Sequence, residues 1–225
     1  MLAGDYLGRG VAEFVGTFAL IFVGAGSALY GNLVVAAFAN GLVIAVMVSA
    51  VGHISGGHFN PAVTLAFLVT KRISAALAGF YWAVQLGAAA LAALLLRWVL
   101  PPGSLHLGVP ALTSIGAGKG VVIEAVLTFF LVWVIFATAV DPRGAFKQIA
   151  GLAIGLTITL DILMGGGLTG GAMNPARAFG PQLVDNRWAN DWVWYVGPGC
   201  GAVIAAVAFE LLYLKPSRAS AAASG

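Results

Sequence analysis

The stretch Gly52-His-Ile-Ser-Gly-Gly-His-Phe-Asn-Pro-Ala-Val63 occurs a second time, without gaps and 114 residues later, as Gly166-Gly-Leu-Thr-Gly-Gly-Ala-Met-Asn-Pro-Ala-Arg177. Upstream, Glu13-Phe-Val-Gly-Thr-Phe-Ala-Leu20 likewise matches Glu124-Ala-Val-Leu-Thr-Phe-Phe-Leu131, with an offset of 111 residues. Two matches at nearly the same offset indicate that the two halves of the chain are an internal repeat.

The composition indicates that lipid is the solvent for most of the chain. Hydrophobic residues make up 60% and charged residues 8%, and the mean hydropathy is +0.98, which is far outside the range of soluble domains. No Asp, Glu, Lys or Arg lies between Glu13 and Lys71, which is enough chain for two crossings of ~20 residues. Further apolar stretches are residues 73–96, 121–140, 148–168 and 192–214. We therefore expect six spans, and the continuous apolar runs argue against a β-barrel, which would show polar alternation.

The placement of Lys and Arg predicts the orientation of these spans. In a six-span arrangement, one side carries Arg9, Lys71, Arg72, Arg143, Lys147, Lys215 and Arg218, and the other carries Arg97, Lys119 and Arg187. The excess puts both termini in the cytoplasm of a multi-pass protein of the cell membrane, either plasma or bacterial inner. Glu13 interrupts the first apolar stretch, so we expect no cleaved signal peptide. The net charge of +3 is explained by topology and indicates no nucleic-acid partner.

The repeat also predicts how the halves are oriented. Each half carries three spans, and because three is odd, the second half is inverted relative to the first. We expect one channel domain over residues 1–225, with a first repeat at about 9–115, a second at about 116–214 and a short cytoplasmic tail at 215–225.

Each half contains an Asn-Pro-Ala motif followed by an apolar segment that is too short to cross a membrane. Asn60 and Asn174 have the character of helix N-caps, and Pro61 and Pro175 follow at the first helical position. Ten helical residues reach ~15 Å, half of a ~30 Å apolar layer. We expect two half-helices that meet tip to tip at the midplane.

Paired glycines precede each motif, at Gly56–Gly57 and Gly170–Gly171. We expect them to let the entering backbone stay extended and expose its carbonyl groups to a water-filled path, where non-helical backbone is tolerated at membrane depth.

These residues resemble the aquaporin, or major intrinsic protein, family. The resemblance rests on the paired Asn-Pro-Ala boxes, which include Ala62 and Ala176, on Arg177 three residues after the second Asn, and on the paired Glu-x-x-x-Thr-Phe starts. It covers about residues 9–214. It implies an all-α membrane protein with six transmembrane helices and two re-entrant half-helices in an inverted repeat. It also implies a homotetramer in membrane lipid, with one pore per subunit for water and small uncharged solutes.

The expected mechanism follows from the half-helices, with the resemblance as support. Both point their positive N-terminal ends at the midplane, where the amides of Asn60 and Asn174 can donate hydrogen bonds to a passing oxygen. This arrangement opposes protons and cations. Arg177 is expected at the narrowest point near the extracellular mouth; the alternative is an arginine that snorkels or anchors a loop.

Other polar residues have expected supporting roles. By resemblance, Glu13 and Glu124 accept hydrogen bonds from the two re-entrant loops, as buried carboxylates need partners. His58, like His53, is expected to anchor a loop, with pH sensing as the alternative. Asp161 either faces the pore and orients Arg177 or makes a contact between helices.

The resemblance places a selectivity filter at four positions: Asn40, Ile162, Gly171 and Arg177. Water-selective relatives usually carry Phe and His at the first two positions, and glycerol facilitators carry aromatic residues and an Asp where this chain has Ala178. The set is more similar to the nodulin-like and archaeal branches, from which Asn40 departs. A filter without aromatic residues predicts a wider constriction that passes water and a small polyol, urea or metalloid hydroxide. Trp194 and Tyr195 resemble instead the aromatic pair of water channels.

The sequence leaves two other classes of function to consider. An ion channel or proton-coupled transporter needs charged residues along its path, and Glu13, Glu124, Asp161 and Glu210 are the available acids. An enzyme is not expected, because the sequence shows no metal-ligand cluster and no nucleophile–base arrangement, and no cofactor or metal site is expected. Cys200 is the single cysteine, so no intramolecular disulfide can form.

Overall fold

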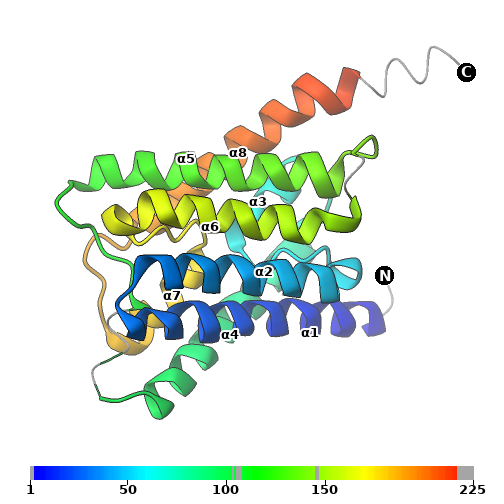
Figure 1. Ribbon diagram of the computed structural model, residues 1–225. Coiled ribbons are helices and arrows are strands. Elements are labelled where there is room, and N and C mark those ends of the chain that lie inside the picture. Colours follow the sequence, from blue (N-terminus) through cyan, green and yellow to red (C-terminus); the bar gives the residue numbers. More distant parts are fainter. Residues whose placement is uncertain (1–2, 103, 105–107, 145–146, 217–225) are drawn as a thin grey trace, which may run out of the picture.

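The computed structural model describes residues 3–102, 104, 108–144 and 147–216, and within them it is built from helices (Figure 1). Six helical segments of the described chain are long and apolar enough to cross a membrane: Asp5–Tyr30, Leu33–Ser55, Ala75–Val99, Ala117–Val140, Ala150–Thr169 and Val193–Leu214. The prediction of six spans is confirmed.

The first three of these segments form the first half of the chain. They comprise α1 (Ala3–Ala19) with the π-helical η1 (Leu20–Ala25) and the 3-10 turn η2 (Ala28–Tyr30), then α2 (Leu33–Ser55), α3 (Pro61–Val69) and α4 (Ala75–Val99). The second half comprises α5 (Ala117–Ile135) with η4 (Phe136–Val140), η5 (Lys147–Ile149), α6 (Ala150–Thr169), α7 (Pro175–Asp185) and α8 (Val193–Phe209) with η6 (Glu210–Leu214).

The two short helices α3 and α7 begin where the Asn-Pro-Ala motifs predict. The side chain of Asn60 accepts hydrogen bonds from the backbone N–H of Ala62 and Val63, and Asn174 does the same for Ala176 and Arg177. A proline follows each cap, where no N–H is needed. With 9 and 11 residues, the helices are about 14 and 17 Å long and end inside the apolar layer.

Because the number of spans is even, the two ends of the described chain are expected on the same side of the membrane. In Figure 1, the start of α1 and the end of η6 lie on the same side of the helix bundle. Lys215 lies at this end, whereas Arg218 and the rest of the predicted tail from residue 217 onward lie outside the described residues.

The packing of the two halves is crosswise. The half-helix α3 of the first half packs against α8 of the second, and the half-helix α7 of the second half packs against α4 of the first. At the centre, α2 packs against its counterpart α6, and α5 packs against α8. This arrangement is the inverted repeat that the odd number of spans per half predicts.

Glycines let the helix backbones approach closely, as small residues do in membrane proteins. A Cβ atom on Gly155 would overlap the carbonyl oxygen of Gly41 and lie 2.7 Å from the Cβ of Ala45. A Cβ atom on Gly201 would overlap the carbonyl of Ala125 across the contact between α5 and α8.

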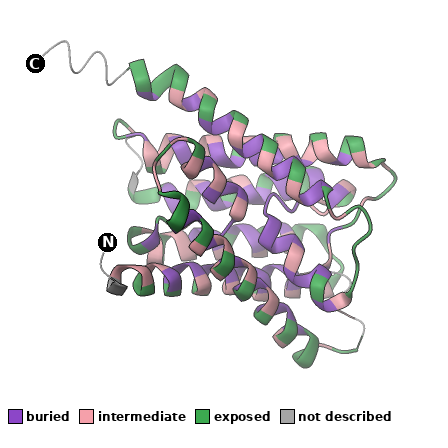
Figure 2. Ribbon diagram, turned by 180° about the vertical axis from the view of Figure 1, so that it is seen from behind, coloured by how far each residue is buried: buried purple, intermediate pink, exposed green. Residues whose placement is uncertain are grey.

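The outer surface is apolar, as a lipid-facing surface must be. Figure 2 shows exposed residues along the outer sides of the helices and buried residues between them. Large hydrophobic residues on this surface include Leu160, which is 66% exposed, and Cys200 is exposed as well.

Gly155→Val should destabilise the contact between α2 and α6. We expect the free energy of unfolding to fall by about 1–3 kcal/mol, the usual cost of overpacking, and the loss should appear as a lower unfolding temperature in detergent. Gly167→Val is the matched control, because it lies on the same helix with no atom within 4 Å of its Cβ position. Equal losses in both variants would contradict the close approach at Gly155.

Candidate functional site

Two loops of non-helical backbone precede α3 and α7, and a buried carboxylate holds each of them. In the first loop, Glu13 accepts hydrogen bonds from the hydroxyl of Ser55 (2.7 Å) and from the backbone N–H groups of His58 (2.9 Å) and Phe59 (2.7 Å). The side chain of Gln85 donates a further bond of 2.9 Å. Glu13 is 0% exposed, so these donors replace the water that a charged group would otherwise need.

The second loop repeats the same arrangement. Glu124, also 0% exposed, accepts hydrogen bonds from the hydroxyl of Thr169 (2.6 Å) and from the backbone N–H groups of Ala172 (3.0 Å) and Met173 (2.7 Å). The hydroxyl of Thr169 in turn accepts the N–H of Gly171 (3.1 Å). Both glutamates therefore lie where the resemblance expects them, in contact with the loops and absent from the residues that line the central cavity.

Aromatic side chains tie the helix ends to these loops in both halves. The hydroxyl of Tyr81 donates to the carbonyl of Ser55 at the end of α2 (2.7 Å), and the indole N–H of Trp194 donates to the carbonyl of Thr169 at the end of α6 (2.9 Å). Both rings are buried. Trp194 thus supports the backbone behind the second loop and does not line the cavity.

The glycines before each motif differ from the expectation that they keep the backbone extended. Gly56, Gly57, Gly170 and Gly171 have φ angles of 96°, 63°, 86° and 53°, which is the left-handed region. The extended interpretation is wrong, because each loop must reverse sharply after α2 or α6 to bring its N–H groups onto the glutamate. Glycine adopts these angles without a steric penalty.

Phe59 and Met173, the residues immediately before the motif asparagines, also have left-handed φ angles, of 48° and 51°. Such angles are uncommon for residues other than glycine. Both residues are buried, and their N–H groups bond to the glutamates. The glutamates therefore hold the backbone in a conformation that it would not favour on its own.

The two motifs meet through their asparagine side chains. The amide N–H₂ of Asn60 donates to the carbonyl of Met173, and that of Asn174 donates to the carbonyl of Phe59, both at 2.9 Å. Each side-chain oxygen is already used as a helix cap. An amide carries two N–H donors, so one donor of each asparagine remains for a molecule in the cavity that both residues line.

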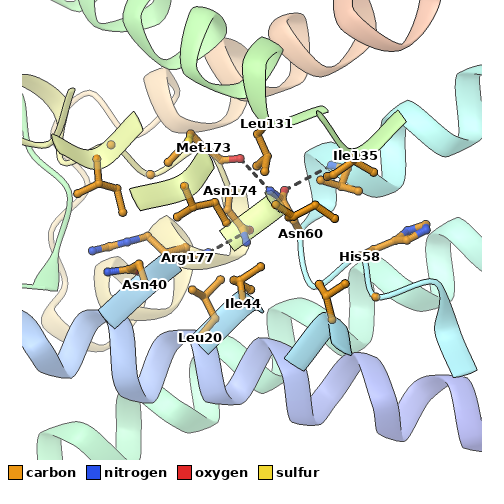
Figure 3. A pocket seen from close by; sticks show the side chains of 18 of the residues that line it. Leu20, Asn40, Ile44, His58, Asn60, Leu131, Ile135, Met173, Asn174 and Arg177 are labelled. Atoms are coloured by element: carbon orange, nitrogen blue, oxygen red, sulfur yellow. Dashed lines mark hydrogen bonds between the residues drawn. The ribbon is translucent and has the colours of Figure 1, made fainter. Parts of the chain in front are cut away.

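A narrow cavity runs along these motifs between the helices. Its volume is about 50 Å³, which is room for only a few water molecules at ~10–15 Å³ each. Figure 3 shows Asn40 and Arg177 at one end, Asn60 and Asn174 in the middle and His58 at the other end. The remaining wall is mostly apolar: Leu20, Ile44, Val48, Val63, Leu131, Ile135, Ala139, Ile154, Ile158, Ile162, Ala172 and Met173.

A second, more open cavity lies beyond Arg177 and includes Asn32, Val109 and Pro110. The two cavities share three residues, Asn40, Ile162 and Arg177. These are three of the four residues expected in the filter, and the fourth, Gly171, lines the narrow cavity with its backbone turned at φ 53°.

Arg177 is held at this junction rather than turned to the membrane surface. It is 8% exposed, and its Nη1 donates to the carbonyl of Gly108 (2.6 Å), while its Nε has no hydrogen-bond partner. Among the residues that line the narrow cavity in the described chain, it is the one with a permanent charge.

The two histidines have different surroundings. His58 lines the cavity, its backbone N–H bonds to Glu13, and its Nδ1 lies 3.1 Å from the hydroxyl of Thr64. His53 is exposed in the last turn of α2, and its side chain makes no hydrogen bond to the described residues, contrary to its expected anchoring role.

Asp161 lies away from the cavity. It is 6% exposed, its Oδ2 has no hydrogen-bond partner, and it is absent from the cavity wall. One turn later on the same side of α6, Gly165 packs against Leu127 of α5. The position agrees with a contact between helices and not with a carboxylate that orients Arg177.

Sequence reasoning missed several residues that build the site. Ser55 and Thr169 align in the repeated stretch, and Tyr81 and Trp194 lie 113 residues apart, so the repeat offset could have revealed both pairs. Gln85 has no such counterpart. Within the described residues, no group of three or more His, Cys, Asp or Glu side chains could hold a metal ion.

The chain matches a known protein family over most of its length. A model described as "Major intrinsic protein" matches residues 3–209. The chain belongs to the major intrinsic protein family. Among members of this family, a probable aquaporin TIP3-2 from Arabidopsis thaliana is 42% identical over 228 residues, which cover 93% of this chain and 85% of that protein. Aquaporin TIP4-4 from Zea mays is 43% identical over 219 residues, which cover 91% and 86%.

A solved structure shows that the fold is shared. The X-ray structure of the aquaglyceroporin from Plasmodium falciparum aligns with a TM-score of 0.83 over 94% of this chain and 98% of that chain, at 22% identity. The expected family and fold class are thus confirmed, and this major intrinsic protein is a membrane channel for water and small solutes. The similarity of its filter to the nodulin-like and archaeal branches stays a prediction.

Glu124→Gln should loosen the second loop. The amide NH₂ group then replaces one carboxylate oxygen and faces a backbone donor, so we expect a loss of about 1–3 kcal/mol in the free energy of unfolding together with lower water permeability. Thermal unfolding in detergent and stopped-flow light scattering of liposomes measure the two effects.

Asp161→Asn is the matched control, since both residues are buried acids on the neighbouring helices α5 and α6 and the Oδ2 of Asp161 accepts no hydrogen bond. It should leave permeability unchanged. A selective loss of permeability in Asp161→Asn, with stability retained, would contradict its assignment as a contact between helices.

Proposed function

We propose that the channel passes water together with small uncharged solutes, of the class of polyols, urea or metalloid hydroxides, and excludes protons and ions. The observation that carries this proposal is the make-up of the constriction where the two cavities meet. Arg177 and Asn40 offer polar groups there, Ile162 forms an apolar wall, and Gly171 contributes no side chain.

The chemistry of this constriction favours neutral molecules with hydrogen-bonding groups on one side. The guanidinium of Arg177 can donate to a hydroxyl or carbonyl oxygen, and Ile162 faces the carbon skeleton of the solute. Because no aromatic ring lies among the four filter residues, the cross-section is expected to exceed that of a filter built for water alone.

The exclusion of protons and cations rests on charge and on water orientation. Arg177 repels cations at the constriction. At the centre, the N-terminal ends of α3 and α7 carry partial positive charge, and the free amide donors of Asn60 and Asn174 both require the oxygen of a passing water. A water held in this orientation cannot also relay a proton through the same site.

Two alternatives remain open to test. The first is a channel chiefly for glycerol, urea or metalloid hydroxides with little selectivity for water, which the missing aromatic residues favour. The second, more distant one is an ion channel or proton-coupled transporter. Against it, Glu13 and Glu124 are occupied by hydrogen bonds from the loops, and neither these residues nor Asp161 line the cavity.

The proposal extends to the setting of the channel. We place it in the plasma or bacterial inner membrane as one channel domain with both termini cytoplasmic, on the distribution of Lys and Arg. We also propose a homotetramer with one pore in each subunit, on the family resemblance, and we propose no catalytic activity.

Replacement of Ile162 by Trp should narrow the constriction. We expect Ile162→Trp to abolish reswelling in gradients of glycerol, urea and boric acid while water flux persists, as measured by stopped-flow light scattering of liposomes. Position 171 is less suitable for this test, because φ 53° at Gly171 strains any side chain.

Leu160→Trp is the control, since residue 160 lies on the same helix but is 66% exposed on the outer surface. It should retain the fluxes of the unmodified protein. Equal loss of solute flux in both variants, or a wild-type protein that passes water and no solute, would refute the wider filter.

Liposomes that contain the channel and a pH-sensitive dye should show no more proton flux than empty liposomes, although water flux is fast. The physical reason is the positive potential at Arg177 and at the ends of the half-helices. Proton or cation flux above the background would support the ion channel alternative instead.

A further inference from the structure

A π-helical segment lies directly behind the filter. The first span changes from α1 to η1 at Leu20–Ala25 and packs there against α2. π-helical turns inside α-helices are frequent at functional sites, and this one is the π-helical segment that contacts α2 beside Asn40. By the repeat offset, Gly24 corresponds to Ile135, which is still α-helical in α5, and the π-helical segment of the second half, η4, begins one residue later at Phe136.

The side chain of Asn40 packs directly against Gly24 of this segment. A Cβ atom on Gly24 would overlap the Oδ1 atom of Asn40 and lie 2.7 Å from its Cγ and 3.1 Å from its Nδ2. The carboxamide therefore occupies the space that any larger residue at position 24 would fill.

The contact with Gly24 and a hydrogen bond hold the side chain of Asn40 in a defined position. Its Nδ2 donates to the carbonyl of Ala36, one turn earlier in α2 (2.8 Å), and the residue is 3% exposed. With its amide bonded back to its own helix and pressed against Gly24, the side chain lies at the wall of both cavities. Asn40 therefore has Gly24 on one side and the path of the solute on another.

The next residue of the segment supports the other polar member of the filter. A Cβ atom on Gly108 would lie 3.0 Å from both the Cβ and the carbonyl oxygen of Ala25, so Gly108 packs directly on Ala25. The carbonyl of Gly108 accepts the hydrogen bond from Nη1 of Arg177. Two adjacent residues, Gly24 and Ala25, therefore lie behind Asn40 and Arg177.

We propose that Gly24 is a positioning residue that sets the width of the filter by keeping the Asn40 carboxamide out of the solute path. The inference rests on the proposed function, because it concerns the same constriction. A methyl group at position 24 displaces the carboxamide of Asn40 from its contact with residue 24, and the displaced carboxamide moves toward Ile162 and Arg177. The filter then narrows without any change to the residues that form it.

The test is a pair of substitutions in liposomes, read by stopped-flow fluxes of water and of glycerol, urea and boric acid. Gly24→Ala should lower solute flux several-fold and more strongly than water flux. Gly24→Ala with Asn40→Ala should restore solute flux to the level of Asn40→Ala alone, because the methyl group then fills the space that the carboxamide has left.

Restored solute flux in the double variant would distinguish a role of Gly24 in positioning Asn40 from a role in ordinary helix packing. If Gly24 served only the packing of the first span, removal of the Asn40 side chain would not restore the ratio of solute flux to water flux. Gly87→Ala is the matched control, since this glycine lies within the membrane-spanning α4 and has no atom within 4 Å of its Cβ position. It should leave all fluxes unchanged.

The outcomes also separate this inference from the proposed function. If the wild-type channel passes no solute, the wider filter is refuted, and the role of Gly24 is then read from water flux, which Gly24→Ala should lower and the double variant restore. Unchanged fluxes in Gly24→Ala, or failure of both the single and the double variant to fold, would overturn the positioning role.

Discussion

The structure depends on the hydrogen bonds that two buried glutamates accept from backbone N–H groups. Non-helical backbone inside a lipid bilayer has no water to bond with, and each unpaired group costs several kcal/mol. Glu13 and Glu124 remove this cost for the loops before α3 and α7. Without these acceptors, the left-handed turns at Phe59 and Met173 would lose what holds them in place.

The site follows from these turns in a chain of local consequences. The turns place Asn60 and Asn174 at the starts of the half-helices, where their side-chain oxygens cap the backbone. Since the oxygens are used in this way, the amide N–H groups must face away from the helices, toward the opposite loop and the cavity. The same second half-helix then carries Arg177, three residues after its cap, to the junction of the two cavities.

Much of this could be predicted from the sequence, because the repeat supplies a second copy of each local signal. The six spans follow from the apolar runs and the caps at Asn60 and Asn174 from the repeated motif, whereas the supporting role of Glu13 and Glu124 is what the family resemblance implies for the repeated glutamates. The backbone angles of Gly56 and Gly57 could not be predicted in the same way, since glycine permits both extended and left-handed conformations.

Contacts that have no counterpart in the other half could not be predicted from the sequence. Nothing in the spacing of Gly24 and Asn40 shows that they touch, and the bond from Arg177 to Gly108 involves a backbone carbonyl that any residue would provide. The orientation of Asp161 depends on how α6 is rotated against α5. An apolar helix such as α6 gives no periodic pattern from which this rotation can be read.

The crosswise packing of the half-helices has a consequence for the order in which the channel is made. The first half-helix, α3, packs mainly against α8, the last long helix of the described residues, and Asn60 donates to a carbonyl of the second loop. A ribosome that has finished the first half has therefore made a loop whose final neighbours do not yet exist. The wall of the pore is complete only when α8 has entered the membrane and packed against α3. A chain that is interrupted before α8 would therefore lack this wall and would not form a smaller channel.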